Sequence, residues 1–231
     1  MLTKEAVGPA IVGVSTKDVP SGLDGRGSGA RLTKRALDVT VALTALIVFG
    51  ALFALIALAV LVSQGRPIFI RHQRIGRGGA SFPCLKFRTM VRDADAALVR
   101  HLAADPGAML EWRATQKLRR DPRVTALGRV LRETSLDELP QLVNIVRGEM
   151  SLVGPRPIVT AEIAHYGGAF ADYRSVRPGL TGLWQCSGRN DLGYEQRVML
   201  DRQYVRTWSL WLDLAILLRT VPAVLRSRGV Y

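Results

Sequence analysis

The segment from Val39 to Val62 constrains the fold more than any other stretch, because its 24 residues include no charged side chain. As a helix it would extend about 36 Å, enough to cross a hydrocarbon core of about 30 Å. The alternative is a buried core helix, but few proteins of this size contain one so long and so uniformly apolar. The segment therefore predicts a membrane element.

The charges on both sides of this segment bear on its path through the membrane. Lys34 and Arg35 precede it, and four arginines follow it, at Arg66, Arg71, Arg74 and Arg77. Positive charge resists translocation, so both ends are expected on the cytosolic side. A re-entrant helix-break-helix satisfies this expectation, with Gly50 as the weakest helical position near the midpoint. A simple span with the small tail outside stays open as the alternative, since Gly breaks a helix less firmly than Pro.

The remaining patterns predict a mainly α fold with a small β-hairpin, built as a monotopic membrane protein. Residues 1–32 are rich in Gly, Ser and Asp and predict a disordered tail, and they show no secretory signal. Residues 33–65 form the expected re-entrant membrane helix, and residues 66–231 a cytosolic catalytic domain with amphipathic interfacial helices. In that domain we expect strands at 68–71 and 82–87 about a glycine turn. Helices are expected at 92–104, just before Ser135, at 157–166 and at 192–207.

The last predicted helix begins at Trp208 and is apolar through its middle. Trp208 and Trp211 would lie at headgroup depth, and Arg219 would reach lipid phosphates. Packing against the protein core is the alternative, because Asp213 and Pro222 interrupt a clean amphipathic pattern.

Charge and cysteine content narrow the choice of partners. The formal net charge is +13, from 32 basic and 19 acidic residues, beside 48% apolar content. This excess calls for an anionic partner such as a lipid, a phosphorylated small molecule or a nucleic acid. The two cysteines, Cys84 and Cys186, form no zinc or disulfide pattern. The simplest interpretation is that the main part of the chain faces the cytosol and keeps both cysteines reduced.

The stretch from Ser135 to Pro157 has the layout of a reactive site. Ser135 and Glu138 have the spacing of a capping box, which would place Asp137 and Glu138 in a first helical turn as ionised carboxylates. Alternatively, the helix starts nearer Leu139, with Pro140 in its first turn. The apolar spacing predicts that the acidic pair faces away from the core. A capped helix with surface acids is the simplest alternative to a site.

Basic residues surround this pair in the sequence. Lys86 and Arg88 leave the second predicted strand, and a cationic run including Arg123 and Arg132 ends beside the carboxylates. Mg²⁺ is commonly held by one or two carboxylates together with substrate phosphates. A carboxylate can then attack a neutralised phosphoryl group. The residues thus suggest phosphoryl transfer at a membrane surface, with a solvated basic face as the alternative.

Seven motifs in order give the chain a family resemblance. They are KRALD at 34–38, RIG and LKFRTM within 74–90, DPRVTALG at 121–128, SLDELPQL at 135–142, GEMSLVGPRP at 148–157 and RPGLTGLWQCSGR at 177–189. Together they resemble the bacterial monotopic phosphoglycosyl transferases, from about Lys34 to the C-terminus. Within that family the chain is most similar to the small exopolysaccharide enzymes that load galactose 1-phosphate onto undecaprenyl phosphate.

The resemblance implies a two-step reaction at the cytosolic face of the bacterial inner membrane. Asp137 matches the family's nucleophile, which attacks a UDP-sugar, expels UMP and holds the sugar phosphate covalently; Glu138 matches its Mg²⁺ ligand. Undecaprenyl phosphate then accepts the sugar phosphate, and exopolysaccharide repeat-unit synthesis begins. The implied substrate-binding residues are Lys86, Arg88, Arg123, Arg156, Gln185 and Arg189, with Arg156 associated with the nucleotide.

Some expectations stay open at this point. Family members commonly break the membrane helix with Ser-Pro, where this chain has Gly50 and Ala51, so the re-entrant path has less support than the chemistry. The sugar, galactose or glucose, is not encoded by any motif. The oligomeric state is open, with a homodimer kept as an alternative. A membrane-anchored binder of anionic ligands and a structural subunit of a polysaccharide export complex are the competing functions. Nucleic acid is not expected, because the arginines accompany an acidic pair that would repel phosphate without a metal.

Overall fold

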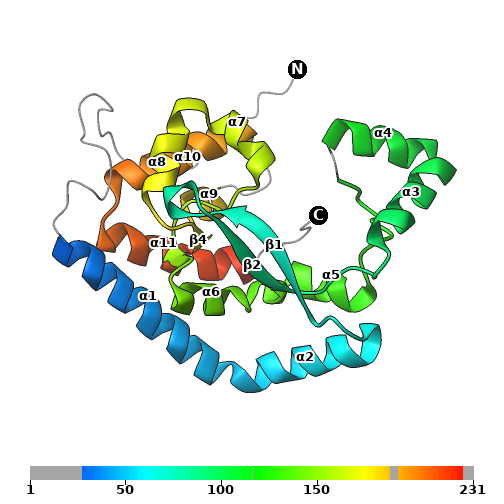
Figure 1. Cartoon of the computed structure of the whole chain (residues 1–231), viewed down its shortest axis with the longest axis horizontal. Coiled ribbons are helices and arrows are strands. Elements are labelled where there is room, and N and C mark those ends of the chain that lie inside the picture. The colour runs from blue at the N-terminus through cyan, green and yellow to red at the C-terminus, as the bar shows by residue number, and fades with distance from the viewer. Residues whose placement is uncertain (1–27, 116, 188–191, 226–231) are drawn as a thin grey trace.

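A computed structural model describes residues 28–115, 117–187 and 192–225. The chain is mainly helical. Helices α1 (Ser28–Val48) and α2 (Gly50–Gln64) run along the lower edge of the molecule in Figure 1, and most other elements pack above them. Helices α3 (Ala94–Ala104) and α4 (Pro106–Thr115) project to one side as a separate arm.

The predicted break near Gly50 is confirmed, although it lies one residue earlier, at Phe49. Phe49 leaves the helical conformation (φ −93°, ψ 10°), and α1 and α2 are bent by 64°. The bend keeps the flanking backbone bonds, because Phe49 N–H still donates to Ala45 O and Phe53 N–H to Phe49 O. Among the described residues, no single helix meets the length and hydropathy expected of a membrane span, whereas the bent pair meets them together.

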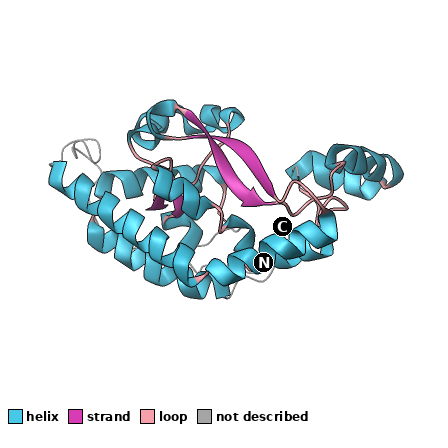
Figure 2. Cartoon of the chain, turned by 60° about the horizontal axis from the view of Figure 1, so that its bottom comes forward, coloured by secondary structure: helices cyan, strands magenta, loops and turns pink. Residues whose placement is uncertain are grey.

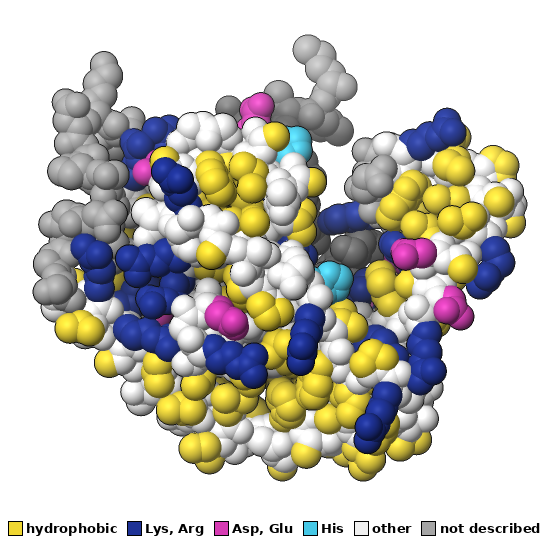
Figure 3. Space-filling model, in the orientation of Figure 1, with side chains coloured by type: hydrophobic (Ala, Val, Ile, Leu, Met, Phe, Trp, Pro, Cys, Tyr) yellow, Lys and Arg dark blue, Asp and Glu magenta, His cyan; other side chains and the backbone are white. Residues whose placement is uncertain are grey.

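The start of α1 corrects one predicted boundary. The helix already begins at Ser28, so the expected disordered tail does not extend to residue 32. The rest of that tail, residues 1–27, lies outside the described residues. Along the bent pair, apolar side chains are exposed at Ile47, Val48, Leu55, Leu58 and Val62. The lower edge of the molecule in Figure 3 is largely apolar. This exposure fits a membrane element, and the bilayer itself stays a prediction.

The β-hairpin is confirmed, with strands longer than expected. Strand β1 (Phe69–Ile75) pairs antiparallel with β2 (Ser81–Phe87), and a short 3-10 turn at Arg77–Gly79 joins them (Figure 2). A second sheet, of parallel strands β3 (Ser151–Val153) and β4 (Gly179–Thr181), was not predicted. Three-residue strands are too short to show an alternating pattern.

The second sheet depends on one close backbone approach. A Cβ placed on Gly179 would lie 2.1 Å from Gly154 N, so only glycine fits there. Gly154 precedes the Pro-Arg-Pro at 155–157, and the approach therefore fixes where this motif leaves the sheet.

The remaining helices agree with the sequence in part. Helices α5 (Ala126–Glu133), α6 (Gln141–Arg147), α10 (Tyr194–Thr207) and α11 (Leu210–Leu225) lie close to the expected ranges, as does α3. The expected helix at 157–166 reaches only from Ile163 to Tyr166 (α7), because Ile158 bridges to Ile75 as a strand residue. Helices α8 (Phe170–Ser175) and α9 (Leu183–Cys186) were not predicted.

The main hydrophobic core lies among α1, α6, α10 and α11, with Ile145, Met150, Tyr204 and Ile216 almost fully buried. Trp208 belongs to this core at 2% exposure, so its predicted place at headgroup depth is wrong. Its indole N–H donates to Asp213 at 3.0 Å, and that partner explains why the ring turns inward. Trp211 is 80% exposed, and its place at headgroup depth stays a prediction.

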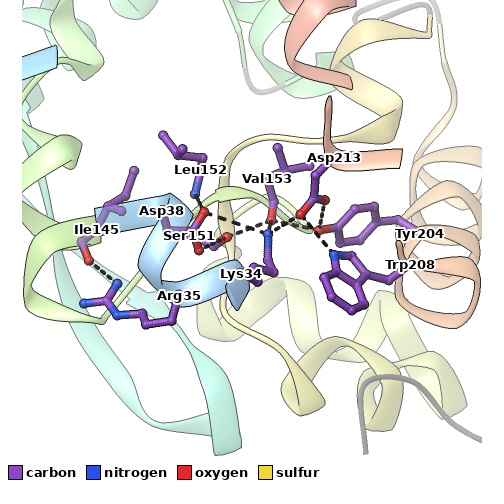
Figure 4. A network of polar contacts seen from close by, with 10 residues as sticks. All are labelled: Lys34, Arg35, Asp38, Ile145, Ser151, Leu152, Val153, Tyr204, Trp208 and Asp213. Atoms are coloured by element: carbon purple, nitrogen blue, oxygen red, sulfur yellow. Dashed lines mark hydrogen bonds and ion pairs between the residues drawn. The ribbon is translucent and has the colours of Figure 1, made fainter. Parts of the chain in front are cut away.

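A buried polar network joins α1 to the body of the molecule (Figure 4). Lys34 Nζ lies 2.6 Å from Asp213 Oδ2. The other carboxylate oxygen of Asp213 accepts a hydrogen bond from the Tyr204 hydroxyl at 2.8 Å. One turn further along α1, Asp38 accepts from Ser151 Oγ and from Leu152 N–H. The first turns of α1 are thus tied to β3 and α11 by charged side chains.

Candidate active site

The acidic pair lies in a short 3-10 turn, Leu136–Glu138, between α5 and α6. Ser135 has a left-handed conformation (φ 58°) and its side chain caps nothing, so the predicted capping box is wrong. A residue at this φ reverses the chain direction instead of starting a helix. The alternative is confirmed, because Pro140 is the N-cap of α6, where a missing N–H costs no helical bond.

Lys86 of β2 lies against both carboxylates. Its Nζ is 2.6 Å from Glu138 Oε1 and 3.6 Å from Asp137 Oδ2. These residues are about fifty positions apart in sequence, so the site exists only through tertiary packing. We call Asp137 and Glu138 the acidic dyad, and Lys86 is the predicted substrate-binding residue that meets it directly.

Asp137 is buried, at 7% exposure, and does not face away from the core as expected. Burial raises the pKa of its carboxyl group, the charge of Lys86 opposes the rise, and the neighbouring Glu138 adds to it. The expectation that Asp137 would simply stay ionised thus overlooked desolvation. For Glu138 burial acts in the same direction, but Lys86, Arg156 and Arg74 outweigh it and lower the pKa.

Asn144 holds the two halves of the site together. Its amide accepts from Leu85 N–H at 3.0 Å and donates to Pro83 O at 2.8 Å, and both residues come just before Lys86 in the same strand. The side chain is fully buried, although its spacing with Asp137 predicted an outward face. A fully hydrogen-bonded buried amide fixes α6 against β2, and so aims Lys86 at the dyad.

Arg132 is a site residue that the sequence interpretation left in the general basic run. It lies in the last turn of α5, donates from Nε to Thr89 Oγ1 at 2.9 Å, and its charge lowers the pKa of Asp137. Its position three residues before Ser135 was the available signal. Arg123, a predicted substrate-binding residue, forms a bidentate ion pair with Asp121. The Nε–Oδ1 distance is 2.8 Å and the Nη2–Oδ2 distance is 2.6 Å.

A second group of cations lies around Trp184, on the side of Arg156. The Arg156 guanidinium is 5.8 Å from the Trp184 ring centre, and that of Arg197 is 4.8 Å away. Lys117 is close enough that burial and the charges of Arg197 and Arg156 lower its pKa. Of these, only Arg156 was predicted. Gln185 follows Trp184 in α9 and is half-buried, while Arg189 lies outside the described residues.

Arg88 has different neighbours from those expected. Its side chain is 4% exposed, and Nη2 donates to the backbone oxygens of Gln64 and Gly65 at the end of α2. Burial lowers its pKa. The described contacts tie Arg88 to the end of the bent helix pair α1–α2, and its role toward substrate stays a prediction.

The sequence comparisons agree with this geometry. A family model for bacterial sugar transferases matches residues 29–227. The chain therefore belongs to the bacterial sugar transferase family. The match includes the dyad, Lys86, both groups of cations and the bent helix pair.

Three relatives in this sugar transferase family show how far the similarity extends. Exopolysaccharide production protein ExoY of Rhizobium meliloti (strain 1021) is 55% identical over 200 residues, which cover 87% of this chain and 88% of that protein. Undecaprenyl-phosphate galactose phosphotransferase of Salmonella typhimurium is 48% identical, across 87% of this chain and 42% of its own length. UDP-glucose:undecaprenyl-phosphate glucose-1-phosphate transferase of Caulobacter vibrioides is 43% identical, across 87% and 72%. The prediction of a phosphoglycosyl transferase is confirmed.

The dyad is suited to a divalent cation even though the chain brings few ligands to it. Among the described residues, no group of three or more His, Cys, Asp or Glu side chains is placed to hold a metal. The Lys86 ammonium lies within 3.6 Å of both carboxylates, which shows that the dyad accepts positive charge between its oxygens. Two carboxylates are a usual protein share for Mg²⁺, whose remaining ligands are water and substrate phosphate.

Proposed function

We propose that this sugar transferase moves a sugar 1-phosphate from a UDP-sugar to undecaprenyl phosphate through a covalent intermediate on Asp137. The observation that carries the proposal is the pairing of a buried carboxylate with Lys86 and Arg132, two cations from separate elements. A buried carboxylate is poorly solvated and therefore reactive, and the cations would draw a diphosphate to it.

In the first step, an Asp137 carboxylate oxygen attacks the β-phosphorus of the UDP-sugar. The bond from that phosphorus to the bridging oxygen breaks, and UMP leaves with the electron pair. Lys86 would balance charge that develops on the phosphoryl oxygens. The arginines around Trp184, Arg156 and Arg197, are suited to the nucleotide phosphate because guanidinium groups bind phosphate through paired hydrogen bonds.

In the second step, a phosphate oxygen of undecaprenyl phosphate attacks the phosphorus held on Asp137. The bond to the carboxylate breaks, the polyprenyl-diphosphate sugar leaves, and Asp137 returns to its free form. Relatives named for undecaprenyl-phosphate galactose and glucose transfer support this acceptor and these sugars. Glu138, with Asp137 beside it, would hold Mg²⁺, which when bound supplies a positive charge that neutralises the diphosphate.

The membrane arrangement is part of the same proposal. The bent pair α1–α2 would enter the inner membrane and return to the cytosolic side, which leaves the dyad at the lipid surface where undecaprenyl phosphate is found. The exposed apolar side chains of both helices and the 64° bend support it. The resulting polyprenyl-linked sugar would start an exopolysaccharide repeat unit, as the name of the relative in Rhizobium suggests.

A single-turnover experiment tests the covalent step. Solubilised protein is mixed with Mg²⁺ and UDP-galactose or UDP-glucose labelled in the sugar, without a lipid acceptor. We expect stoichiometric UMP and a labelled protein, with both lost in Asp137→Asn. The matched control is Asp95→Asn, which removes an exposed carboxylate on the α3–α4 arm and should retain the label. A label that persists in Asp137→Asn would refute the nucleophile assignment.

A further inference from the structure

Two adjoining hollows lie outside the acidic dyad, and six basic residues are among those that line them. One is formed by α1, β3, the end of α8 and the hairpin turn, and the other by the hairpin turn and the residues after α6 and α8. Arg77, Ser175 and Arg177 belong to both. Their basic lining residues are Arg31, Lys34, Arg35, Arg77, Arg174 and Arg177. Neither hollow includes a residue of the dyad.

The positive charges in these hollows lie close together without enough negative charge to balance them. Burial lowers the pKa of Arg177, and the neighbouring charges of Arg35 and Arg77 lower it further. The lining carboxylate is Asp38, which is already bound to Ser151 and Leu152 and lies 3.9 Å from Lys34. Guanidinium groups held near one another in this way favour the binding of an anion between them.

The two central arginines are held in place by backbone carbonyl groups. Arg35 donates from Nη1 to Ile145 O at 2.6 Å and from Nη2 to Val146 O at 2.9 Å. Arg177 donates from Nε to Gly148 O at 2.7 Å, which leaves its two terminal amino groups without a hydrogen bond to the described residues. The site is thus preorganised by the C-terminal end of α6, and binding would not have to order these side chains.

Arg77 and Arg174 complete the site from the solvent side. Both side chains are exposed, and neither has a hydrogen bond or an ion pair within the described ranges. Arg77 comes from the hairpin turn and Arg174 from the last turn of α8, so they approach the hollows from different elements. A ligand could therefore bind both guanidinium groups without breaking a hydrogen bond or an ion pair of the described residues.

The position of the hollows along α1 indicates the kind of anion. Leu32 is exposed three residues before Arg35, and the next exposed large apolar side chains of this helix, Leu37 and Val41, follow Arg35 by two and six residues. From Leu37 onward such side chains recur along the helix as far as Val48. A helix advances about 1.5 Å per residue, so Leu37 and Val41 lie about 3 and 9 Å further along. The polar layer of one leaflet is about 5 to 8 Å deep. If α1 enters the membrane as proposed above, the hollows lie at the depth of lipid headgroups.

We propose that Arg35, Arg77, Arg174 and Arg177 form a second anion site, which binds the phosphate group of an anionic lipid headgroup. Arginine binds phosphate oxygens through paired, charge-assisted hydrogen bonds, and four guanidinium groups offer more donors than one phosphate can accept. Such a site would orient the enzyme on the membrane surface and would leave the dyad free for substrate. The headgroup depth of the hollows follows from the proposed membrane insertion, whereas the ability of the four arginines to bind an anion does not depend on it.

Binding of short-chain lipids to the full chain in a non-ionic detergent tests this assignment. Titration calorimetry with dihexanoyl phosphatidylglycerol is compared with dihexanoyl phosphatidylcholine and with inorganic phosphate. We expect saturable binding of the anionic lipid, weakened about tenfold or more in Arg77→Gln/Arg174→Gln. Both arginines are exposed, so the double variant should fold. The matched control, Arg100→Gln/Arg113→Gln, makes the same charge change on the α3–α4 arm and should bind as the parent protein does.

Three results would overturn the proposal. These are equal binding in the parent protein and Arg77→Gln/Arg174→Gln, equal loss in the control variant, and binding of inorganic phosphate without preference for the anionic lipid. UMP release in the same preparation separates this site from the proposed function. The double variant should keep that activity in detergent, and Asp137→Asn should keep the lipid binding while losing UMP release.

Discussion

Lys86 makes the two carboxylates of the dyad chemically different. Its ammonium group lies closer to Glu138 than to Asp137. The pKa of Glu138 is therefore lowered, whereas burial raises the pKa of Asp137. A pair of acids with separated pKa values is a usual sign of divided roles. The buried member is suited to attack, and the half-exposed member to a cation.

The raised pKa of Asp137 predicts an acidic limit to the first half-reaction. The nucleophile is the ionised form, so the rate of protein labelling should fall as the pH drops through the raised pKa. In Lys86→Met the opposing charge is lost, and this limit should move to higher pH by about one unit or more. Single-turnover labelling across a pH series measures both. An unchanged limit in Lys86→Met, with Arg113→Gln as the control, would contradict the proposed coupling.

Asp201 provides a second residue-scale prediction, this time for stability. Burial raises its pKa to about 8, although the Tyr166 hydroxyl donates to it at 2.7 Å, and its other oxygen is buried without a hydrogen bond in the described structure. Because the folded pKa exceeds the unfolded value, stability is lost as the pH rises from the unfolded value toward about 8. We expect the thermal midpoint of the parent protein to fall between about pH 4 and about pH 8, and this carboxylate should cause no further fall above that.

Asp201→Asn should remove most of that fall, because an amide can still accept from Tyr166 and has no charge to desolvate. Thermal unfolding of both proteins across the pH range checks this. A parallel decline in Asp201→Asn would show that another group causes it.

At the scale of elements, the junction of α1 with α11 depends on one buried ion pair. Lys34 and Asp213 have side chains only 12% and 4% exposed, and they lie 2.6 Å apart. Removing one partner leaves the other charge buried, so Asp213→Asn should lower the free energy of unfolding by about 3 kcal/mol. Arg202→Gln is the matched control, because its pair with Asp172 is half exposed and should contribute less than about 1 kcal/mol.

Thermal or denaturant unfolding in detergent measures this difference. The double variant Lys34→Met/Asp213→Asn should recover part of the loss, since neither charge of this pair is then left buried without the other. Equal effects of Asp213→Asn and Arg202→Gln would mean that the network in Figure 4 contributes little.

At the scale of the whole molecule, the path of α1 and α2 determines which side of the membrane the N-terminus occupies. A re-entrant pair places Ser28 and the catalytic body on one side, whereas a span separates them. Single cysteines at Ser28 and at the exposed Gln73, in a chain without Cys84 and Cys186, distinguish the two arrangements. In sealed cells a membrane-impermeant thiol reagent should label neither position, and both should react after lysis. Labelling of Ser28→Cys alone from outside would establish a span.

Much of this architecture could be predicted from local sequence. The uncharged run with Gly50 at its midpoint predicted two helices and a break, and glycines between β-rich segments predicted the hairpin. Adjacent Asp137 and Glu138 before Pro140 marked the reactive turn. These features depend on neighbours within a few residues, whose backbone preferences hold in any surroundings.

The arrangement of charge around the dyad could not be predicted in this way. Lys86 and Arg88 are two residues apart, yet one meets the carboxylates and the other clamps the end of α2. Asn144 at a fully buried position selects the first of these contacts by fixing α6 on β2. The sequence alone thus singled out the two carboxylates of the dyad as a candidate site. Tertiary packing determined how deeply Asp137 is buried and which cations reach it, because desolvation and charge pairing depend on residues far apart in the chain.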